Sequence, residues 1–254
     1  MPETQQGTHP NGTIITFEED PHTYTDDAGR SYKSFTSLIH DYFPKFDAEK
    51  TAARVAANRG KTAQELIQEW EEAGDRASRY GTRVHENCEA LMKGLPTPNR
   101  AENETEERVF AHAVAVIDYL KSKYQFIAAE KILFSPRCRV AGTVDLMMVD
   151  GDTLWILDYK TNKEIKQTAY RNETGLFPLT HLANCGMEHY AMQLSLAETV
   201  AKMEGYIPRD TPVRRALIHF PHETAPEWIE TPDRRIECYE MLIDHVANSN
   251  IVPF

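Results

Sequence analysis

Apolar and polar positions change periodicity several times along the chain, which predicts a mixture of short strands and helices. Three short segments, at 14–17, 22–25 and 31–34, predict a small β-meander near the N-terminus. Residues 1–12 have no such pattern, and we expect them to be disordered. Capping and breaking residues then predict helices at 36–43, 47–58, 62–73 and 75–93.

The second part of the chain predicts a helix, three strands, a helix, a strand and a closing helix. The first helix is expected over 102–124, where Val109, Ala113 and Leu120 follow one face. Strands are expected at 126–134, 140–149, 153–159 and 214–220, helices at 184–203 and 233–247, and a loop over 164–182. We therefore expect an α/β protein with two parts. Residues 1–100 are the β-meander and a helical extension packed on the core, and residues 101–254 are the core.

Three charged residues interrupt two of these apolar strands. Asp145 lies in the first strand, Asp158 and Lys160 lie in the second, and Asp150-Gly151 predicts a hairpin turn between them. A two-residue loop at 150–151 places Asp145 opposite Ile156 and diagonal to Asp158, roughly 7 Å away. A four-residue loop over 150–153 would place the two aspartates directly opposite each other. In both registers the three charges share one face, because side chains alternate along a strand.

This arrangement favours a divalent cation between the two carboxylates. The alternative is that the charges face solvent on an amphipathic hairpin. The second strand argues against it, because Leu154, Trp155, Ile156 and Leu157 leave neither face polar, and such a strand is usually buried on both. Buried charges need a partner or a metal ion, and carboxylate oxygens suit Mg²⁺ or Mn²⁺.

Further polar residues are candidates for the same site, each with a purely structural alternative. Glu130 interrupts the apolar strand before the hairpin, either as a metal ligand or as an exposed strand residue. His85 and Glu89 share a helix face at i, i+4, a spacing that surface pairs also have. Gln193 lies beside an apolar stripe of its helix, which by itself indicates no function.

Composition limits the class of protein. With 254 residues, 41% hydrophobic and 26% charged, the chain resembles soluble globular proteins, and no apolar run reaches membrane-spanning length. The N-terminus lacks signal-peptide character, so we expect a cytoplasmic protein. The cysteines at 88, 138, 185 and 238 form no C-x-x-C pair, which favours reduced thiols over a zinc or iron–sulfur site. The net charge of −11 argues against a general polyanion binder, but residues 121–171 hold nine Lys or Arg against six Asp or Glu and could face a nucleic acid.

The ordered set of these residues resembles the PD-(D/E)XK nuclease superfamily, in its RecB-like branch. The resemblance rests on Gly142-Thr143-Val144-Asp145, followed by Asp158-Tyr159-Lys160-Thr161 with 13 residues from acid to acid. It extends to Gly81, His85 and Glu89 at four-residue intervals upstream, and to Tyr190-x-x-Gln193 downstream. The chain looks similar to mitochondrial genome maintenance exonucleases and to phage-encoded RecB-like exonucleases.

The resemblance implies a restriction-endonuclease-like fold and metal-dependent hydrolysis of DNA. One or two Mg²⁺ or Mn²⁺ ions, and no iron–sulfur cluster, would be bound by Asp145, Asp158, Glu130, His85 and the backbone carbonyl of Tyr159. The implied catalytic residues are Asp145, Asp158, Lys160 and His85, and the implied substrate contacts are Gln193, Tyr190, Thr161 and Arg83. Ala197 stands where RecB-like proteins often have a tyrosine, which leaves the substrate role of this helix open.

The resemblance further implies an exonuclease that acts on single-stranded DNA ends. It would serve DNA repair or recombination, with a replication or recombination protein as partner and no membrane, in the host cytoplasm if phage-encoded. The alternatives are a duplex exonuclease of the phage lambda recombination type, an endonuclease, and a non-catalytic DNA-binding module. The presence of Asp145, Asp158 and Lys160 disfavours the last of these.

Overall fold

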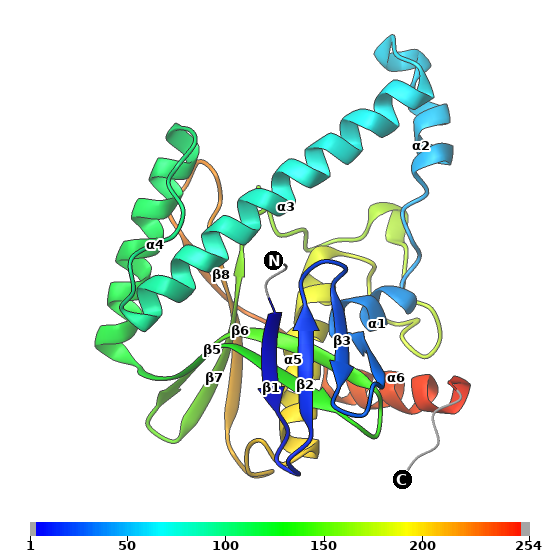
Figure 1. The fold of residues 1–254 in the computed structure, drawn as a ribbon. Coiled ribbons are helices and arrows are strands. Elements are labelled where there is room, and N and C mark those ends of the chain that lie inside the picture. Colours follow the sequence, from blue (N-terminus) through cyan, green and yellow to red (C-terminus); the bar gives the residue numbers. More distant parts are fainter. Residues whose placement is uncertain (1–3, 250–254) are drawn as a thin grey trace.

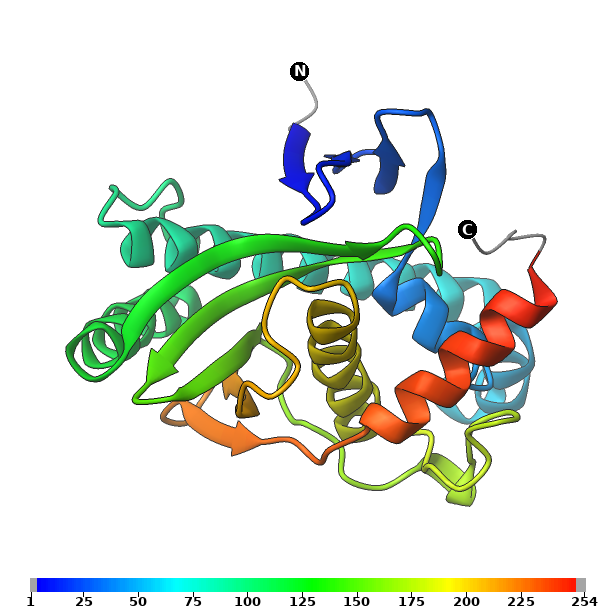
Figure 2. The same ribbon diagram turned by 90° about the horizontal axis from the view of Figure 1, so that it is seen from below.

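A mixed β-sheet runs through the centre of the molecule, with helices on both of its faces (Figure 1, Figure 2). The computed structural model describes residues 4–249. The strands in that part of the chain are β1 (Thr4–Thr8), β2 (Ile14–Glu18), β3 (Thr23–Asp26), β4 (Ser31–Ser34), β5 (Gln125–Ser135), β6 (Val140–Asp150), β7 (Thr153–Lys160), β8 (Val213–His219) and β9 (Glu227–Glu230). Eight follow the order β1-β2-β3-β4-β6-β7-β8-β9, and β5 pairs with β6.

Two hydrophobic cores hold the helices against the sheet. The helices are α1 (Phe35–Asp41), α2 (Ala48–Val55), α3 (Ala63–Lys93), α4 (Glu104–Lys123), α5 (Gly186–Met203) and α6 (Arg235–Asn248), and short 3₁₀ turns lie at Ala57–Arg59 and Tyr170–Asn172. One core joins the sheet to α1, α5 and α6, and the other joins it to α3 and α4. β7 gives Leu154 and Ile156 to the first core and Trp155 and Leu157 to the second. The predicted α/β fold and the burial of this strand on both faces are therefore confirmed.

The N-terminal strands form an antiparallel meander that joins the rest of the sheet through β4. β2, β3 and β4 are the predicted strands, and β4 runs parallel to the start of β6, with Ser34 opposite Ala141. The expected disorder of residues 1–12 is wrong for Thr4–Thr8, which pair with β2; residues 1–3 lie outside the described part. The sequence TQQGT has no apolar alternation, so the hydrophobic pattern does not predict a strand here. Backbone pairing and close packing hold this strand instead. A Cβ on Gly7 would lie 2.9 Å from the Cβ of Ile132.

The segment from 63 to 93 is one long helix, so the expectation of two helices, 62–73 and 75–93, is wrong. α3 begins with a capping box between Thr62 and Glu65 and ends at Gly94, whose φ is +72°. Gly74 does not interrupt it, because an interior glycine costs only about 0.5–1 kcal/mol relative to alanine. α2 and the N-terminal half of α3 project from the sheet (Figure 1). We call this projection, residues 48–77, the arm; Ala52, Leu66 and Trp70 pack within it.

β6 and β7 form the predicted hairpin in the second of the two registers. Asp150 pairs with Thr153 and Leu146 with Leu157, so Gly151 and Asp152 make the turn. Gly151 has a φ of +59°, which glycine adopts without a side-chain clash and which favours it at the first position of a two-residue turn. The register based on a loop at 150–151 is therefore wrong, and Met147 rather than Asp145 lies opposite Ile156. Continued by one residue, the observed register brings Asp145 opposite Asp158.

The C-terminal part completes the sheet. β8, the last predicted strand, runs parallel to β7, and β9, which we did not predict, pairs antiparallel with β8. The cysteines are free and buried, Cys88 in the core under α3 and α4 and the other three in the core under α5. Among the described residues, no helix has the length and apolar character to cross a membrane.

Candidate active site

The acidic residues of the hairpin lie where β6 and β7 separate. Their pairing ends at Leu146 and Leu157. Beyond these residues the start of β6 pairs with β4, and β7 continues beside β8 up to Lys160. Asp145 and Asp158 are the first residues past the separation. The backbone N–H of Tyr159 donates to Asp145 Oδ2 at 2.8 Å, so a side chain takes the place of a strand-to-strand hydrogen bond there.

Asp158 and Lys160 form a buried ion pair that α5 holds in place. Lys160 Nζ lies 2.5 Å from Asp158 Oδ2, and Gln193 Nε2 donates to Asp158 Oδ1 at 3.2 Å. The Lys160 ammonium also lies over the ring of Tyr190, 4.6 Å from its centroid. Only 3% of Asp158 is exposed, so protein groups rather than bulk water fix its carboxylate.

Two other side chains gather beside Asp145. His85 of α3, Glu130 of β5 and Asp145 offer ligand atoms that all lie within 4.8 Å of one another. Glu130 reaches Asp145 across the β5–β6 ladder, between the pairs Ala129–Leu146 and Lys131–Val144. Its φ of +50° is uncommon for a residue other than glycine. Such backbone strain, of order 1–3 kcal/mol, concentrates at functional sites.

Both ring nitrogens of His85 have partners. Nε2 lies 3.0 Å from the carbonyl oxygen of Tyr159, and Nδ1 lies 3.3 Å from Asp145 Oδ2. A proton on Nε2 satisfies the carbonyl, and the lone pair of Nδ1 then faces a carboxylate oxygen. Two acceptors that face each other at this distance favour a cation between them.

Burial and like charges make this site attractive to positive charge. Burial raises the pKa of Glu130 to about 9, and the negative charges of Asp145, Glu89 and Asp158 act in the same direction. Burial also raises the pKa of Asp158 to about 6. The positive charge of Lys160 opposes this rise, and the negative charge of Asp145 adds to it. Burial alone would lower the pKa of Lys160, but Asp158 and Asp145 outweigh it, so the pKa is raised and the ammonium stays charged.

These donors fit a divalent metal ion. Carboxylate oxygens suit Mg²⁺, and Mn²⁺ accepts both carboxylate and imidazole ligands. A cation among Asp145, Glu130 and His85 would offset the repulsion that raises the pKa of Glu130. Asp158 lies opposite Asp145 on the neighbouring strand. It adds a further carboxylate to an acidic set of the kind that the sequence predicted.

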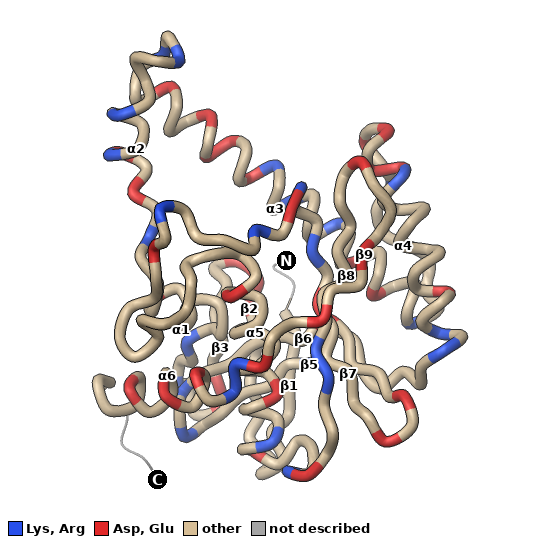
Figure 3. The backbone as a smooth tube through the Cα atoms, turned by 180° about the vertical axis from the view of Figure 1, so that it is seen from behind, with Lys and Arg blue, Asp and Glu red and all other residues tan. Residues whose placement is uncertain are grey.

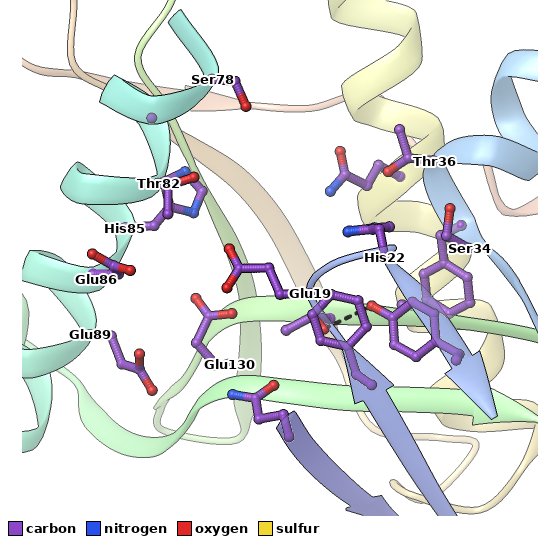
Figure 4. A pocket seen from close by; sticks show the side chains of 18 of the residues that line it. Glu19, His22, Ser34, Thr36, Ser78, Thr82, His85, Glu86, Glu89 and Glu130 are labelled. Atoms are coloured by element: carbon purple, nitrogen blue, oxygen red, sulfur yellow. Dashed lines mark hydrogen bonds between the residues drawn. The ribbon is translucent and has the colours of Figure 1, made fainter. Parts of the chain in front are cut away.

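Three residues of the site, His85, Glu130 and Gln193, line a cleft of about 700 Å³ (Figure 4), and Asp145, Asp158 and Lys160 are not among its lining residues. α3 lines one side with Ser78, Thr82, His85, Glu86 and Glu89. The N-terminal meander lines the other with Phe17, Glu19, His22 and Tyr24, and Glu130, Thr143 and Gln193 also line the cleft. In Figure 4 the carboxylates of Glu19 and Glu130 point into the space that His85 borders.

Most of the predicted site residues lie together. The connected group consists of His85, Glu130, Asp145, Asp158, Tyr159, Lys160, Tyr190 and Gln193. Thr161 lies at its edge, with Oγ1 3.4 Å from where a Cβ on Gly81 would be. Arg83 does not line the cleft, because it forms ion pairs with Glu102 and Glu106 beside α4. The individual roles of these residues stay predictions.

Sequence reasoning missed the residues of the β2–β3 turn. Glu19 and His22 precede His85 by more than sixty residues, and no spacing connects them with the hairpin motif. The pairing of β4 with β6 brings the meander to the cleft. Such a contact between distant segments leaves no local pattern from which it could have been found.

Comparisons with known proteins place this architecture in a family. A family model for the PD-(D/E)XK nuclease superfamily matches residues 23–248. No curated protein matches the sequence. A solved structure described as that of a candidate exonuclease from Eubacterium rectale is similar over 87% of this chain and 83% of that chain, with 11% identity and a TM-score of 0.37. The match of the family model over most of the chain shows that the protein, with its restriction-endonuclease-like α/β fold, belongs to the PD-(D/E)XK nuclease superfamily.

Proposed function

We propose that this protein is a divalent-cation-dependent DNA exonuclease of the RecB-like branch that acts on the ends of single-stranded DNA. The observation that carries the proposal is the group of Asp145, Glu130 and His85 beside the Asp158–Lys160 ion pair. Ligands for a cation next to a fixed ammonium are what the hydrolysis of a phosphodiester requires.

The proposed metal site has one or two Mg²⁺ or Mn²⁺ ions. Asp145, Glu130 and His85 would hold the first, and Asp158 and the carbonyl of Tyr159 are the further predicted ligands. When bound, such an ion neutralises charge on the phosphate and lowers the pKa of a coordinated water. The β7 backbone orients two of these ligands, because the Tyr159 carbonyl contacts His85 and the Tyr159 N–H donates to Asp145.

Lys160 would stabilise the negative charge that develops on the phosphate. Its ammonium is held between Asp158 and the ring of Tyr190. A fixed charge in buried surroundings acts more strongly than one in water, and it needs no reorganisation during the reaction. Gln193 holds Asp158 from α5, so its first role would be to position this pair. Thr161 and Arg83 stay predicted substrate contacts.

The proposed preference for single strands rests on the N-terminal part of the chain. Residues 45–61 contain five Lys or Arg and two Asp or Glu, and basic residues follow α2 to the tip of the arm (Figure 3). Phe46, 70% exposed, packs against Trp70 with ring centroids 5.6 Å apart. Basic residues beside an exposed aromatic ring suit a single strand with unstacked bases. We therefore assign substrate choice and His85 to residues 1–100, and hydrolysis to residues 101–254.

The test is digestion of end-labelled DNA with Mg²⁺ or Mn²⁺, using single and double strands in linear and circular form. We expect linear single strands to be degraded from an end. Asp158→Ala and Lys160→Ala should each lower the rate at least about a hundredfold, as the loss of one preorganised electrostatic group commonly does. Asp152→Ala, in the exposed turn of the same hairpin, is the matched control and should keep the activity.

The alternatives are distinguished by the same substrates. Equal cleavage of circular and linear single strands would indicate an endonuclease, and preference for duplex ends would indicate an exonuclease of the phage lambda recombination type. Activity close to that of the wild type in Asp158→Ala would refute the assignment of this site. Cytoplasmic location and a replication or recombination protein as partner remain part of the proposal.

A further inference from the structure

The wall of the cleft opposite α3 is aromatic. Phe17, His22 and Tyr24 of the N-terminal meander line it, and we call these three residues the aromatic wall. Phe17 and Tyr24 are cross-strand partners whose rings stack with centroids 4.6 Å apart and planes at 29°. The His22 ring meets Phe17 edge-on, with centroids 4.9 Å apart and planes at 85°. The three rings therefore form one packed group on the side of the cleft that faces the metal ligands.

The aromatic wall is tied to the strand that carries Asp145. The hydroxyl groups of Tyr24 and Thr143 lie 3.1 Å apart in a hydrogen bond, and Thr143 precedes Asp145 by two residues on β6. Tyr24 is only 3% exposed, so it supports the other two rings rather than offering its own surface. The position of Phe17 and His22 relative to the metal ligands is thereby fixed through β6.

His22 is exposed and has no polar partner. Its ring makes no hydrogen bond or ion pair with any residue between 4 and 249, although it lies at the edge of a cleft. Its φ of +60° lies in the left-handed region, which histidine enters more often than most residues other than glycine. Its ring packs edge-on against Phe17. The His22 ring is therefore exposed and held beside the candidate site, where it can contact a ligand.

We propose that the aromatic wall binds a nucleobase of the substrate, next to the phosphate that is hydrolysed. A nucleotide has an anionic phosphate at one end and a flat ring at the other. In the cleft the carboxylates of Glu19 and Glu130 point into the space that His85 borders, and the rings of the aromatic wall lie on the meander side (Figure 4). A cation held on the acidic α3 side would bind the phosphate. The base would then lie against the aromatic wall on the opposite side. No Lys or Arg is among the described residues that line the cleft, so the wall has no cation with which to hold a phosphate itself. The cleft volume of about 700 Å³ suits a ligand of nucleotide size.

The inference rests on the proposed function and makes it more specific. Stacking of one base on an aromatic side chain contributes about fivefold to 150-fold in affinity, whatever the base. The aromatic wall would therefore fix the position of the nucleotide without reading its identity. Stacking on the wall would also require an unpaired base. The cleft itself would therefore favour single-stranded DNA.

The test compares abasic substitutions with a change of His22. A fluorescent single-stranded oligodeoxynucleotide carries one abasic residue, moved along it one position at a time, and binding is measured by anisotropy with Mg²⁺ in a Lys160→Ala background that slows hydrolysis. We expect one position at which the abasic residue weakens binding about fivefold to 150-fold. Adding His22→Asn should remove the effect at that position and leave the others unchanged. Asparagine tolerates a positive φ, so this change removes the ring with little strain on the turn.

Tyr239→Ala is the control variant, because it removes an exposed aromatic residue of α6 that does not line the cleft, and it should leave the abasic profile unchanged. An abasic profile that is the same with and without His22→Asn would overturn the inference. If the wild-type protein hydrolyses DNA, this result refutes only the aromatic wall, whereas a wild type that neither binds nor hydrolyses DNA refutes the proposed function as well.

Discussion

Gln193 offers the sharpest test of how the active site is built. The sequence predicted it as a substrate contact, whereas its amide donates to Asp158 Oδ1 at 3.2 Å. Gln193→Ala removes that donor. The other carboxylate oxygen keeps its contact with Lys160 Nζ at 2.5 Å, so the ion pair persists while the carboxylate gains freedom to rotate. We therefore expect Gln193→Ala to affect the chemical step more than the binding of DNA.

The size of the effect follows from the burial of Asp158. With 3% of the residue exposed, water has little access to the oxygen that loses its donor. An unsatisfied buried acceptor costs about 1–3 kcal/mol. If this cost falls on the transition state, kcat decreases about fivefold to 150-fold, because each 1.36 kcal/mol is a factor of ten in rate. Gln193→Glu should lower kcat further, since a second carboxylate would then face Asp158.

Steady-state hydrolysis of a linear single strand measures the two parameters separately. Positioning of Asp158 predicts a reduced kcat with KM within about twofold of the wild type, as expected for an interaction that matters mainly in the transition state. Gln125→Ala, at the exposed start of β5, is the matched control and should change neither. A raised KM with an unchanged kcat would refute the reasoning and restore Gln193 to the role of a substrate contact.

Three further predictions concern packing, pH and the metal ion. Gly142→Ala should lower the free energy of unfolding by about 1–3 kcal/mol in urea titrations, because the new Cβ would lie 2.2 Å from Phe35 Cδ2; an unchanged midpoint would contradict this packing. Burial, with the charge of His40, lowers the pKa of His189 to about 4, so the unfolded chain binds more protons between pH 6.5 and 4 and stability should decrease across that window as the pH is lowered. The full shift corresponds to about 3 kcal/mol, which solvent screening of the part-exposed ring reduces to about 1–2 kcal/mol, and His189→Gln should flatten the pH dependence of the unfolding free energy. Mg²⁺ at a hundred times its Kd should stabilise the folded chain by about 2.7 kcal/mol in thermal unfolding, and EDTA should reverse this stabilisation. The Glu130→Gln variant should lose most of the stabilisation by Mg²⁺. If Mg²⁺ stabilises the variant as much as the wild type, Glu130 is excluded as a ligand.

The sequence by itself determined the elements of the core and brought the charged residues of the hairpin to one face. Apolar runs marked β5, β6 and β7, and the apolar residues on both faces of β7 indicated a strand buried on both sides. Inside such a strand Asp158 and Lys160 needed a partner or a metal ion, and in the structure they contact each other. These predictions succeed because strand parity and burial depend on residues a few positions apart. Gly74 shows the limit of local rules, since a residue that weakens a helix does not end it when the flanking residues favour the helix.

Only the tertiary structure decided how the site is assembled. The turn at Gly151 and Asp152 selected one of two registers that the hydrophobic pattern allowed equally, because a shift of two residues leaves every side chain on the same face. The separation of β6 from β7 is a property of the whole sheet, since β4 pairs with the start of β6, whereas β7 continues beside β8. The aromatic wall reaches the proposed metal ligands through that sheet, from more than sixty residues before His85. Contacts of this kind are fixed by packing between distant segments, and no periodicity along the chain records them.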